Sequence, residues 1–343
     1  MGVVNAYVVL TSAWRSLDRR QIQRAALSSC SLVSADHVPE VEFQWGFFMG
    51  DPPEDPRQRE QAAEELITND DLIVVGGHDL DPPVAQDVTY VLPRPTARAY
   101  RVAFATRWLY HHHDPDFVFY LDDDAFLSLP RLAMLLLGVM THHSEGLDSA
   151  VVGFTMQTAL DWSAMDMDVC DMCGDNCIQC VSDLDLRAWC KKVAPGMGLA
   201  GCLLAMKNCK IMGGEEGMST AECVEYTVKK NNEVSEYFGS KWAPTWVLGM
   251  GWGFGRRVIR HVAQNAGQLK LRGAADVILG FWLAGLEDLD WVDVGTLGGR
   301  RFHDHPGGTS MFAAECTDAS ILIHRLNEAR WRGFDNQTCK MTC

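Results

Sequence analysis

The sequence predicts an α/β protein with a doubly wound, parallel sheet. Short apolar runs alternate with helix-like segments up to Asp122, which is the pattern of successive strand–helix units. The run at 117–121 contains only apolar and aromatic residues, as expected for a strand buried on both faces. The carboxylates Asp122, Asp123 and Asp124 follow this run directly. Ligands of such sheets bind beyond the carboxyl ends of the strands, where this triplet is expected to lie.

The elements before the triplet are short and closely spaced. We expect strands at 3–10, 41–49, 72–75 and 117–121, because each is an apolar run bounded by turn residues or charged segments. Helices are expected from about Ser16 or Asp18 to Leu27, and at 58–67 and 97–111. Arg19, Arg20 and Arg24 fall on one side of the first helix. This side could be a solvated face, or it could lie near a bound nucleotide.

Regular elements continue after the triplet. A helix is expected at 130–140 and strands at 150–154 and 320–324, the last one ending in His324. A further helix starts at 273–280, with Asp276 in its first turn, where a carboxylate is favourable for the helix dipole alone. Between these lies the glycine-rich run 249–255, whose glycines permit a ligand to approach the backbone. Trp246 and Trp252 are candidates either for stacking on a sugar or for the core.

Composition narrows the class of partner. The chain has 343 residues, a formal net charge of −15 and a pI near 5.1, which argues against a nucleic-acid partner because phosphate backbones are bound by clustered Lys and Arg. No apolar run is long enough to span a bilayer, and the N-terminus lacks the pattern of a signal peptide. We therefore expect a soluble protein or a catalytic region without its membrane anchor; the oligomeric state is left open.

Twelve cysteines are many for a cytosolic protein, and eight of them lie between Cys170 and Cys223. Their even number and clustering favour disulfides in an oxidising compartment. The spacing from Cys170 to Cys180 also allows a zinc site, and free thiols remain a third possibility. A sequon for N-glycosylation at 336–338 agrees with the secretory route.

The aspartate triplet predicts a metal site. Carboxylates at the end of a buried strand need a partner, and a divalent cation satisfies several of them at once. Hard oxygen ligands suit Mg²⁺ or Mn²⁺, which keep coordination positions for substrate phosphates. The hypothesis from these residues is a metal–diphosphate site, and the alternative is a solvated, Asp-rich turn.

Five sequence landmarks occur in an order that resembles the β-1,3-galactosyltransferase family of inverting glycosyltransferases, related to β-1,3-N-acetylglucosaminyltransferases and Fringe. The landmarks are TSxxxxxxRRxxxR (Thr11, Ser12, Arg19, Arg20, Arg24), DDDxF (Asp122 to Phe126), GxGF (Gly251 to Phe254), ADVxLG (Ala275 to Gly280), and ILIH with a following tryptophan (Ile321 to His324, Trp331). The resemblance covers most of the chain outside a cysteine-rich insertion at about 165–232.

The resemblance implies a GT-A glycosyltransferase fold in a single domain, residues 1–343. Residues 1–129 would form a nucleotide-sugar half, and residues 130–343 an acceptor half that carries the insertion. The donor would be a UDP-sugar bound with Mn²⁺ or Mg²⁺, and the acceptor a glycan or glycoconjugate hydroxyl. Galactose and N-acetylglucosamine are the donor sugars that the family favours. Together with the cysteines and the sequon, the resemblance implies the Golgi lumen.

The resemblance also implies roles for individual residues. Asp124 matches the direct metal ligand and His324 the second one, with Asp122 and Asp123 supporting metal, ribose or sugar contacts. Asp276 matches the general base, and one base without a covalent nucleophile gives inversion at the anomeric carbon. Donor contacts are implied for Thr11, Ser12, Arg19, Arg20, Arg24 and Arg101, and sugar or acceptor contacts for Trp246, Gly251 and Trp252.

The sequence departs from the family at two informative positions. Ala275 stands where the family has a glutamate that organises the acceptor side, and Arg101 stands in place of a lysine. The loss at Ala275 motivates an alternative, a catalytically inactive glycan-binding or scaffold protein that retains the fold.

Overall fold

The fold was analysed in a computed structural model. It describes residues 2–77, 79, 96–142, 146–156, 244–271, 275–295, 301–307 and 312–343, with the isolated residues Lys192, Ser219, Glu222, Glu225, Lys229, Glu236 and Gly239. Most of the cysteine-rich segment at 165–232 lies outside these residues, so its disulfides remain a prediction.

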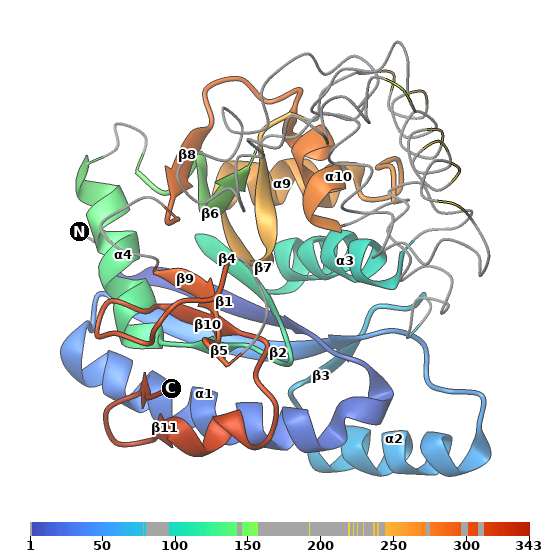
Figure 1. Ribbon diagram of the computed structural model, residues 1–343, viewed down its shortest axis with the longest axis vertical. Helices are drawn as coiled ribbons and strands as arrows, with labels where there is room; N and C mark the ends of the chain where they lie inside the picture. The colour runs from blue at the N-terminus through green and yellow to red at the C-terminus, as the bar shows by residue number, and fades with distance from the viewer. Residues whose placement is uncertain are drawn as a thin grey trace.

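Among the described residues, a seven-stranded sheet forms the centre of the molecule, in the order β3-β2-β1-β4-β7-β6-β8 (Figure 1). Its strands are β1 (Val4–Thr11), β2 (Val41–Met49), β3 (Leu72–Val74), β4 (Phe117–Asp122), β6 (Ala150–Met156), β7 (Trp246–Gly255) and β8 (Asp290–Asp293). Strand β7 runs antiparallel to both of its neighbours, and the other pairs are parallel. The predicted α/β class with a doubly wound sheet is confirmed, and the antiparallel strand β7 makes this mostly parallel sheet mixed.

Helices cover both faces of this sheet. One face carries α1 (Leu17–His37), α2 (Pro56–Thr68) and α4 (Leu129–His142); the other carries α3 (Ala97–His112), α9 (Arg256–Asn265) and α10 (Ala275–Leu283) (Figure 1). Side chains of β1 alternate between the two layers. Val8 and Leu10 join the core under α1, whereas Tyr7 and Val9 join the core under α3. Strand β1 is thus buried on both faces.

The C-terminal part of the chain returns to the end of strand β4, where the aspartate triplet lies. Strand β10 (Leu322–His324) pairs with β5 (Phe126–Leu127), which begins two residues after Asp124, and with β9 (Phe302–Asp304). A 3₁₀ turn η5 (Arg330–Gly333) and a hairpin of β11 (Phe334–Asp335) and β12 (Lys340–Met341) follow; another 3₁₀ turn, η1 (Trp14–Ser16), precedes α1. These two- and three-residue strands carry residues of distant sequence position to one edge.

The glycine-rich run forms a buried strand, β7. A Cβ at Gly251 would overlap Leu322, and one at Gly253 would overlap Phe117. Gly251 and Gly253 have no side chain, which leaves room for Leu322 and Phe117 to pack against the backbone of β7. This corrects the expectation that Gly251 contacts a sugar, because its open side is filled by the core.

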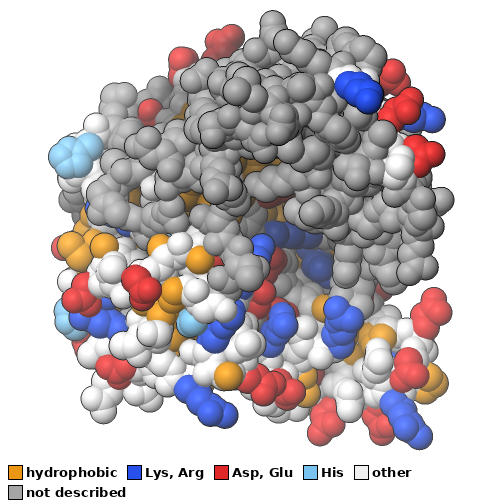
Figure 2. Space-filling model, in the orientation of Figure 1, with side chains coloured by type: hydrophobic (Ala, Val, Ile, Leu, Met, Phe, Trp, Pro, Cys, Tyr) orange, Lys and Arg blue, Asp and Glu red, His pale blue; other side chains and the backbone are white. Residues whose placement is uncertain are grey.

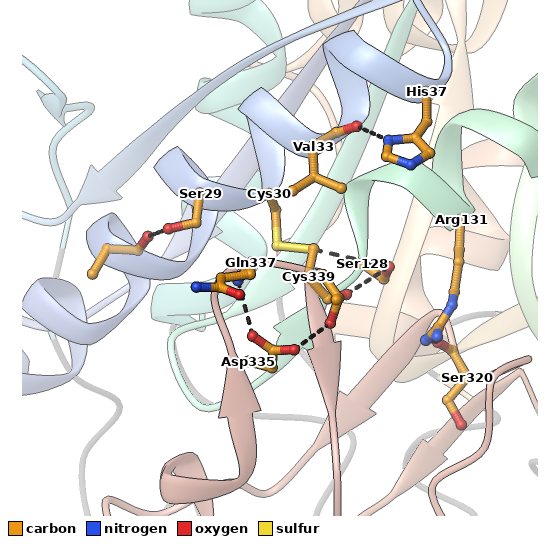
Figure 3. The surroundings of a disulfide bond; sticks show 12 residues. Ser29, Cys30, Val33, His37, Ser128, Arg131, Ser320, Asp335, Gln337 and Cys339 are labelled. Carbon is orange, nitrogen blue, oxygen red and sulfur yellow. Dashed lines mark hydrogen bonds between the residues drawn. A yellow bond between two sulfur atoms is a disulfide. The ribbon is translucent and has the colours of Figure 1, made fainter.

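The four cysteines that the structure describes form two disulfides, Cys30–Cys339 and Cys316–Cys343. The first ties helix α1 to the C-terminal hairpin, where Ser128 donates a hydrogen bond to the Cys339 carbonyl (Figure 3). The sequon residue Asn336 lies exposed in the turn of that hairpin. None of the helices among the described residues is both long and apolar enough to cross a bilayer.

Candidate active site

The aspartate triplet lies at the carboxyl edge of the central sheet, as predicted. In the parallel register of β1 and β4, Thr11 stands opposite Asp122. The Thr11 hydroxyl donates a hydrogen bond of 2.5 Å to Oδ1 of Asp122. The end of one buried strand therefore orients the first carboxylate of the triplet.

The Asp123 carboxylate accepts hydrogen bonds from the loop after β1 and from helix α1. Its Oδ2 accepts a hydrogen bond of 2.6 Å from Ser12, and its Oδ1 accepts one of 3.1 Å from Arg19. Gln23 donates to the Asp123 carbonyl from the buried side of α1. With 7% exposure, this carboxylate is held almost entirely by groups of the protein. Asp123 thus fixes the conformation that presents its two neighbours.

Asp122, Asp124 and His324 form a cluster whose potential ligand atoms all lie within 4.8 Å of one another. Strand β10 brings His324 to this place because Ile323 pairs with Phe126, just after the triplet. Nε2 of His324 lies 3.4 Å from Oδ1 of Asp124. That carboxylate oxygen is buried and has no hydrogen-bond partner among the described residues.

This cluster fits a divalent cation. A buried carboxylate oxygen without a donor is costly, and a metal would satisfy it. Burial raises the pKa of Asp124, His324 lowers it, and the neighbouring Asp122 and Asp123 raise it again. A cation in their midst would favour the ionised form of all three carboxylates. The imidazole in the donor set suits Mn²⁺ better than Mg²⁺, which prefers oxygen ligands.

Arg98 joins this cluster to the second part of the site. Its Nη1 lies 3.1 Å from Oδ2 of Asp122, and its Nη2 donates a hydrogen bond of 2.6 Å to the Gly249 carbonyl. The guanidinium lies over the Trp252 ring, 4.8 Å from its centroid. Arg98 belongs to none of the sequence landmarks. A signal was present, since arginine in the first turn of a helix opposes the helix dipole and implies an anionic partner.

Asp276 lies in the first turn of α10, beside the Gly249 backbone to which Arg98 is hydrogen-bonded. Its Oδ2 accepts a hydrogen bond of 3.0 Å from the Gly249 N–H, and its Oδ1 accepts one of 2.9 Å from the Val277 N–H. Burial raises the pKa of Asp276, and the positive charge of Arg98 partly offsets this effect. A carboxylate in such surroundings is a competent proton acceptor near neutral pH.

The triplet borders a recess of about 210 Å³. Its lining combines hydroxyl, basic and acidic side chains: Thr11, Ser12, Ala13, Arg15, Ser16, Arg19, Arg98, Arg101, Asp122, Asp123 and Asp124. Figure 2 shows acidic and basic side chains gathered around a recess near the middle of the visible face. Four arginines beside three carboxylates can hold an anionic group and a cation together.

Comparisons with known proteins give distant likenesses only. No protein-family model matches the sequence, and no curated protein matches it. Among solved structures, the galactosyltransferase LgtC in complex with donor and acceptor sugar analogues shares 10% identity over 95% of this chain and 88% of its own, with a TM-score of 0.33. The bifunctional glycosyltransferase WbbM, in its apo structure, shares 10% identity over 95% of this chain and 46% of its own, with a TM-score of 0.36. These structural neighbours are glycosyltransferases, but scores this low carry no argument about function.

Two of the predicted donor contacts, Arg20 and Arg24, do not line the recess, although Arg20 donates a hydrogen bond of 3.0 Å to the Ser12 hydroxyl, which does. Arg20 is fully buried, and its Nε and Nη2 donate to the two carboxylate oxygens of Glu65 at 2.9 and 2.6 Å. Arg24 binds both carboxylate oxygens of Asp71 at 2.7 and 2.9 Å. These pairs anchor α1 to α2 through Glu65 and to the start of β3 through Asp71, so Arg20 and Arg24 have structural partners in the fold. Thr11, Ser12, Arg19 and Arg101 do line the recess.

The two tryptophans also belong to the packed interior. Trp252 is fully buried and stacks on Tyr120 at a centroid distance of 6.2 Å. Because the Trp252 ring is not exposed, neither of its faces is open to a sugar, and Trp252 belongs to the core. Trp246 is 7% exposed and packs near Gly280 of α10, and its indole Nε1 has no hydrogen-bond partner among the described residues.

Proposed function

We propose that this protein is a metal-dependent GT-A glycosyltransferase that transfers a hexose from a UDP-sugar to a hydroxyl of a glycan or glycoconjugate. The observation that carries the proposal is the cluster of Asp122, Asp124 and His324 with its unpartnered buried oxygen. Arg98 connects this cluster to the half-buried carboxylate Asp276. The motif resemblance supports galactose or N-acetylglucosamine as the sugar and a β-1,3 linkage as the product.

Asp122, Asp124 and His324 would hold Mn²⁺. When bound, the ion stabilises negative charge on the departing diphosphate. Arg15 and Arg19 line the same recess and add positive charge on the diphosphate side. The donor half of the site thus binds and orients the leaving group.

Asp276 would accept the proton from the attacking acceptor hydroxyl. Hydrogen bonds from Gly249 and Val277 hold its carboxylate in place. With one base and no covalent nucleophile, the acceptor oxygen displaces UDP directly, and an α-linked donor yields a β-linkage. The two disulfides support a lumenal location in the secretory pathway, such as the Golgi.

A panel of UDP-sugars, assayed for Mn²⁺-dependent release of UDP, tests the proposal. We expect hydrolysis or transfer with one hexose donor, and a loss of about 10²–10⁴-fold in kcat for Asp276→Asn, because the amide cannot accept the proton. Asp288→Asn is the matched control, since Asp288 is exposed and its φ of 55° suits asparagine equally well. Absence of Mn²⁺-dependent turnover with every UDP-sugar and acceptor would overturn the enzymatic proposal.

The second candidate is a glycan-binding protein without turnover. Ala275 favours it, because this position is 7% exposed and packs in the core around α3 and α10, so it offers the acceptor no carboxylate. Binding of UDP with Mn²⁺ but no product over the whole panel would support this candidate. Catalysis that is lost in Asp276→Asn would exclude it.

A further inference from the structure

We infer that Asp304 is a positioning residue for the metal site, which fixes the tautomer and the orientation of His324. The inference rests on the proposed function for its metal. It concerns, however, a residue that neither the sequence motifs nor the comparisons single out. In this role Asp304 would act on the metal site through His324 and would not itself be a ligand.

The register of the small sheet brings the two residues together. Strands β9 and β10 are parallel, and His324 is paired with Asp304. Oδ1 of Asp304 lies 2.7 Å from Nδ1 of His324, and the Asp304 side chain is only 3% exposed. This is a short contact between a buried carboxylate and the ring nitrogen that faces away from the triplet.

The acceptor chemistry of the carboxylate determines the tautomer of the imidazole. An ionised carboxylate can only accept a hydrogen bond, so Nδ1 must carry the hydrogen. In the neutral ring, the lone pair then resides on Nε2. That nitrogen is the one that lies 3.4 Å from Asp124 within the cluster. The hydrogen bond thus presents the ligand atom to the place where the cation is proposed.

The backbone after His324 reinforces this arrangement. Arg325 has a φ of 64°, in the left-handed region that is uncommon for a residue with a side chain. From this conformation its Nε lies 3.2 Å from Oδ2 of Asp304, so consecutive residues contact the two oxygens of one carboxylate. The N–H of Leu326 then donates a hydrogen bond of 2.8 Å to the Asp124 carbonyl. The turn therefore fixes His324 relative to both its orienting carboxylate and the triplet.

A partner of this kind affects metal affinity without being a ligand. Hydrogen-bond partners of ligating histidines fix the ring orientation and raise its basicity, and their loss typically costs 10- to 100-fold in metal affinity. We expect the same range for Asp304. Asp304→Asn keeps one acceptor oxygen and loses the charge, so its effect should be smaller than that of Asp304→Ala.

Titration calorimetry with Mn²⁺ tests the inference on the full chain. We expect the dissociation constant to rise about 10- to 100-fold in Asp304→Ala and less in Asp304→Asn. The matched control is Asp318→Asn, because Asp318 is an aspartate with 85% side-chain exposure outside the cluster. The dissociation constant of His324→Gln gives the effect of losing the proposed ligand itself, for comparison.

A second readout is independent of metal and of activity. Nitrogen-15 spectra of the protein with labelled histidine, without metal, are expected to show His324 with its hydrogen on Nδ1 in the wild type. In Asp304→Asn the alternative tautomer should become populated. A protein whose native structure depends on Asp304 only for packing would not show this change in a folded variant.

The outcomes separate the inference from the proposed function. Failure of the wild type to bind Mn²⁺ would overturn the metal site, while the nitrogen spectra would still decide the tautomer. Mn²⁺ binding that is equal in wild type and Asp304→Ala, or a His324 hydrogen on Nε2 in the wild type, would overturn the role of Asp304. Should Asp304→Ala not fold, the wild-type spectrum and Asp304→Asn decide the question.

Discussion

Arg98 stands between two carboxylates that the proposed reaction uses differently. Asp122 belongs to the metal cluster, and Asp276 must be ionised to accept a proton. One guanidinium contacts the first carboxylate and favours the charged form of the second. The same group donates to the carbonyl of Gly249, and the N–H of this glycine donates to Asp276. Loss of Arg98 therefore affects the charge and the position of the base together.

This arrangement predicts the acidic limb of the pH profile. Only the ionised form of Asp276 can accept a proton, so kcat/KM falls as the pH drops through its pKa. Because burial raises this pKa, the fall lies above the ordinary aspartate value of about 3.9. In Arg98→Gln the favourable charge is lost, the pKa rises further, and the limb moves to higher pH. Profiles of kcat/KM at saturating Mn²⁺ measure the shift.

Arg107→Gln provides the control, because Arg107 is an exposed arginine of the same helix. Its profile should coincide with that of the wild type. An acidic limb in Arg98→Gln that also coincides with the wild type would contradict the electrostatic role of Arg98.

Residues could be predicted from sequence where a local pattern marks them. The aspartate triplet follows a buried strand, and the structure places it with His324 as the motif order implies. Asp304 escaped prediction because its partner His324 is set by strand pairing, and Arg98 because only its place in the first turn of α3 marks it. The pairing of Arg20 with Glu65 could not be predicted for the same reason, since these residues lie on different helices.

Strand β7 depends on glycines where its backbone meets other parts of the chain. At Gly255, between β7 and α9, an added Cβ would overlap the Leu147 carbonyl oxygen. The clash is with backbone, which cannot move aside as a flexible side chain can. This glycine is therefore required by the packing of the element.

We expect Gly255→Ala to lower the free energy of unfolding by about 3 kcal/mol, which is at the upper end for single substitutions. Gly267→Ala is the control, because an added Cβ there meets no atom within 4 Å and it should change stability by less than about 0.5 kcal/mol. Urea unfolding curves of the two variants provide the comparison. Equal midpoints would show that the junction relaxes around the new side chain.

Two long elements were predicted closely because their residues carry a period, whereas α1 extends to His37, beyond its expected end at Leu27, and β7 was not predicted as a strand. The helix expected at 97–111 is found at Ala97–His112, and the strand expected at 41–49 is found with these bounds. Strands β5 and β9 have only two and three residues, too few for an alternating pattern. They exist because β10 pairs with them, which no local window reveals.

The molecule as a whole is closed by a long-range covalent link. Cys30 and Cys339 are separated by 309 positions, and their disulfide joins α1 to the C-terminal hairpin (Figure 3). The hairpin follows the strand that carries His324. This link restricts the unfolded chain far more than a short loop would.

Replacing the pair by serines, Cys30→Ser with Cys339→Ser, should lower the free energy of unfolding by about 5.7 kcal/mol on the chain-entropy relation. The same double replacement at Cys316 and Cys343, separated by 27 positions, should cost about 3.5 kcal/mol. Chemical denaturation of the two variants compares them directly. The order of the two losses is the decisive result, and a larger loss for the shorter loop would contradict it.

The reversed direction of β7 has a consequence for how the protein can diversify. Because β7 runs against β4 and β6, its first residues and the last residues of β6 lie at the same edge as the aspartate triplet. Met156 and Trp246 pair there, and the chain between them includes the cysteine-rich stretch. Both attachment points of that stretch are therefore at the edge of the sheet that carries the proposed active site. If the chain is the proposed glycosyltransferase, mutations or insertions between them would alter which acceptor is admitted while every strand of the sheet keeps its register.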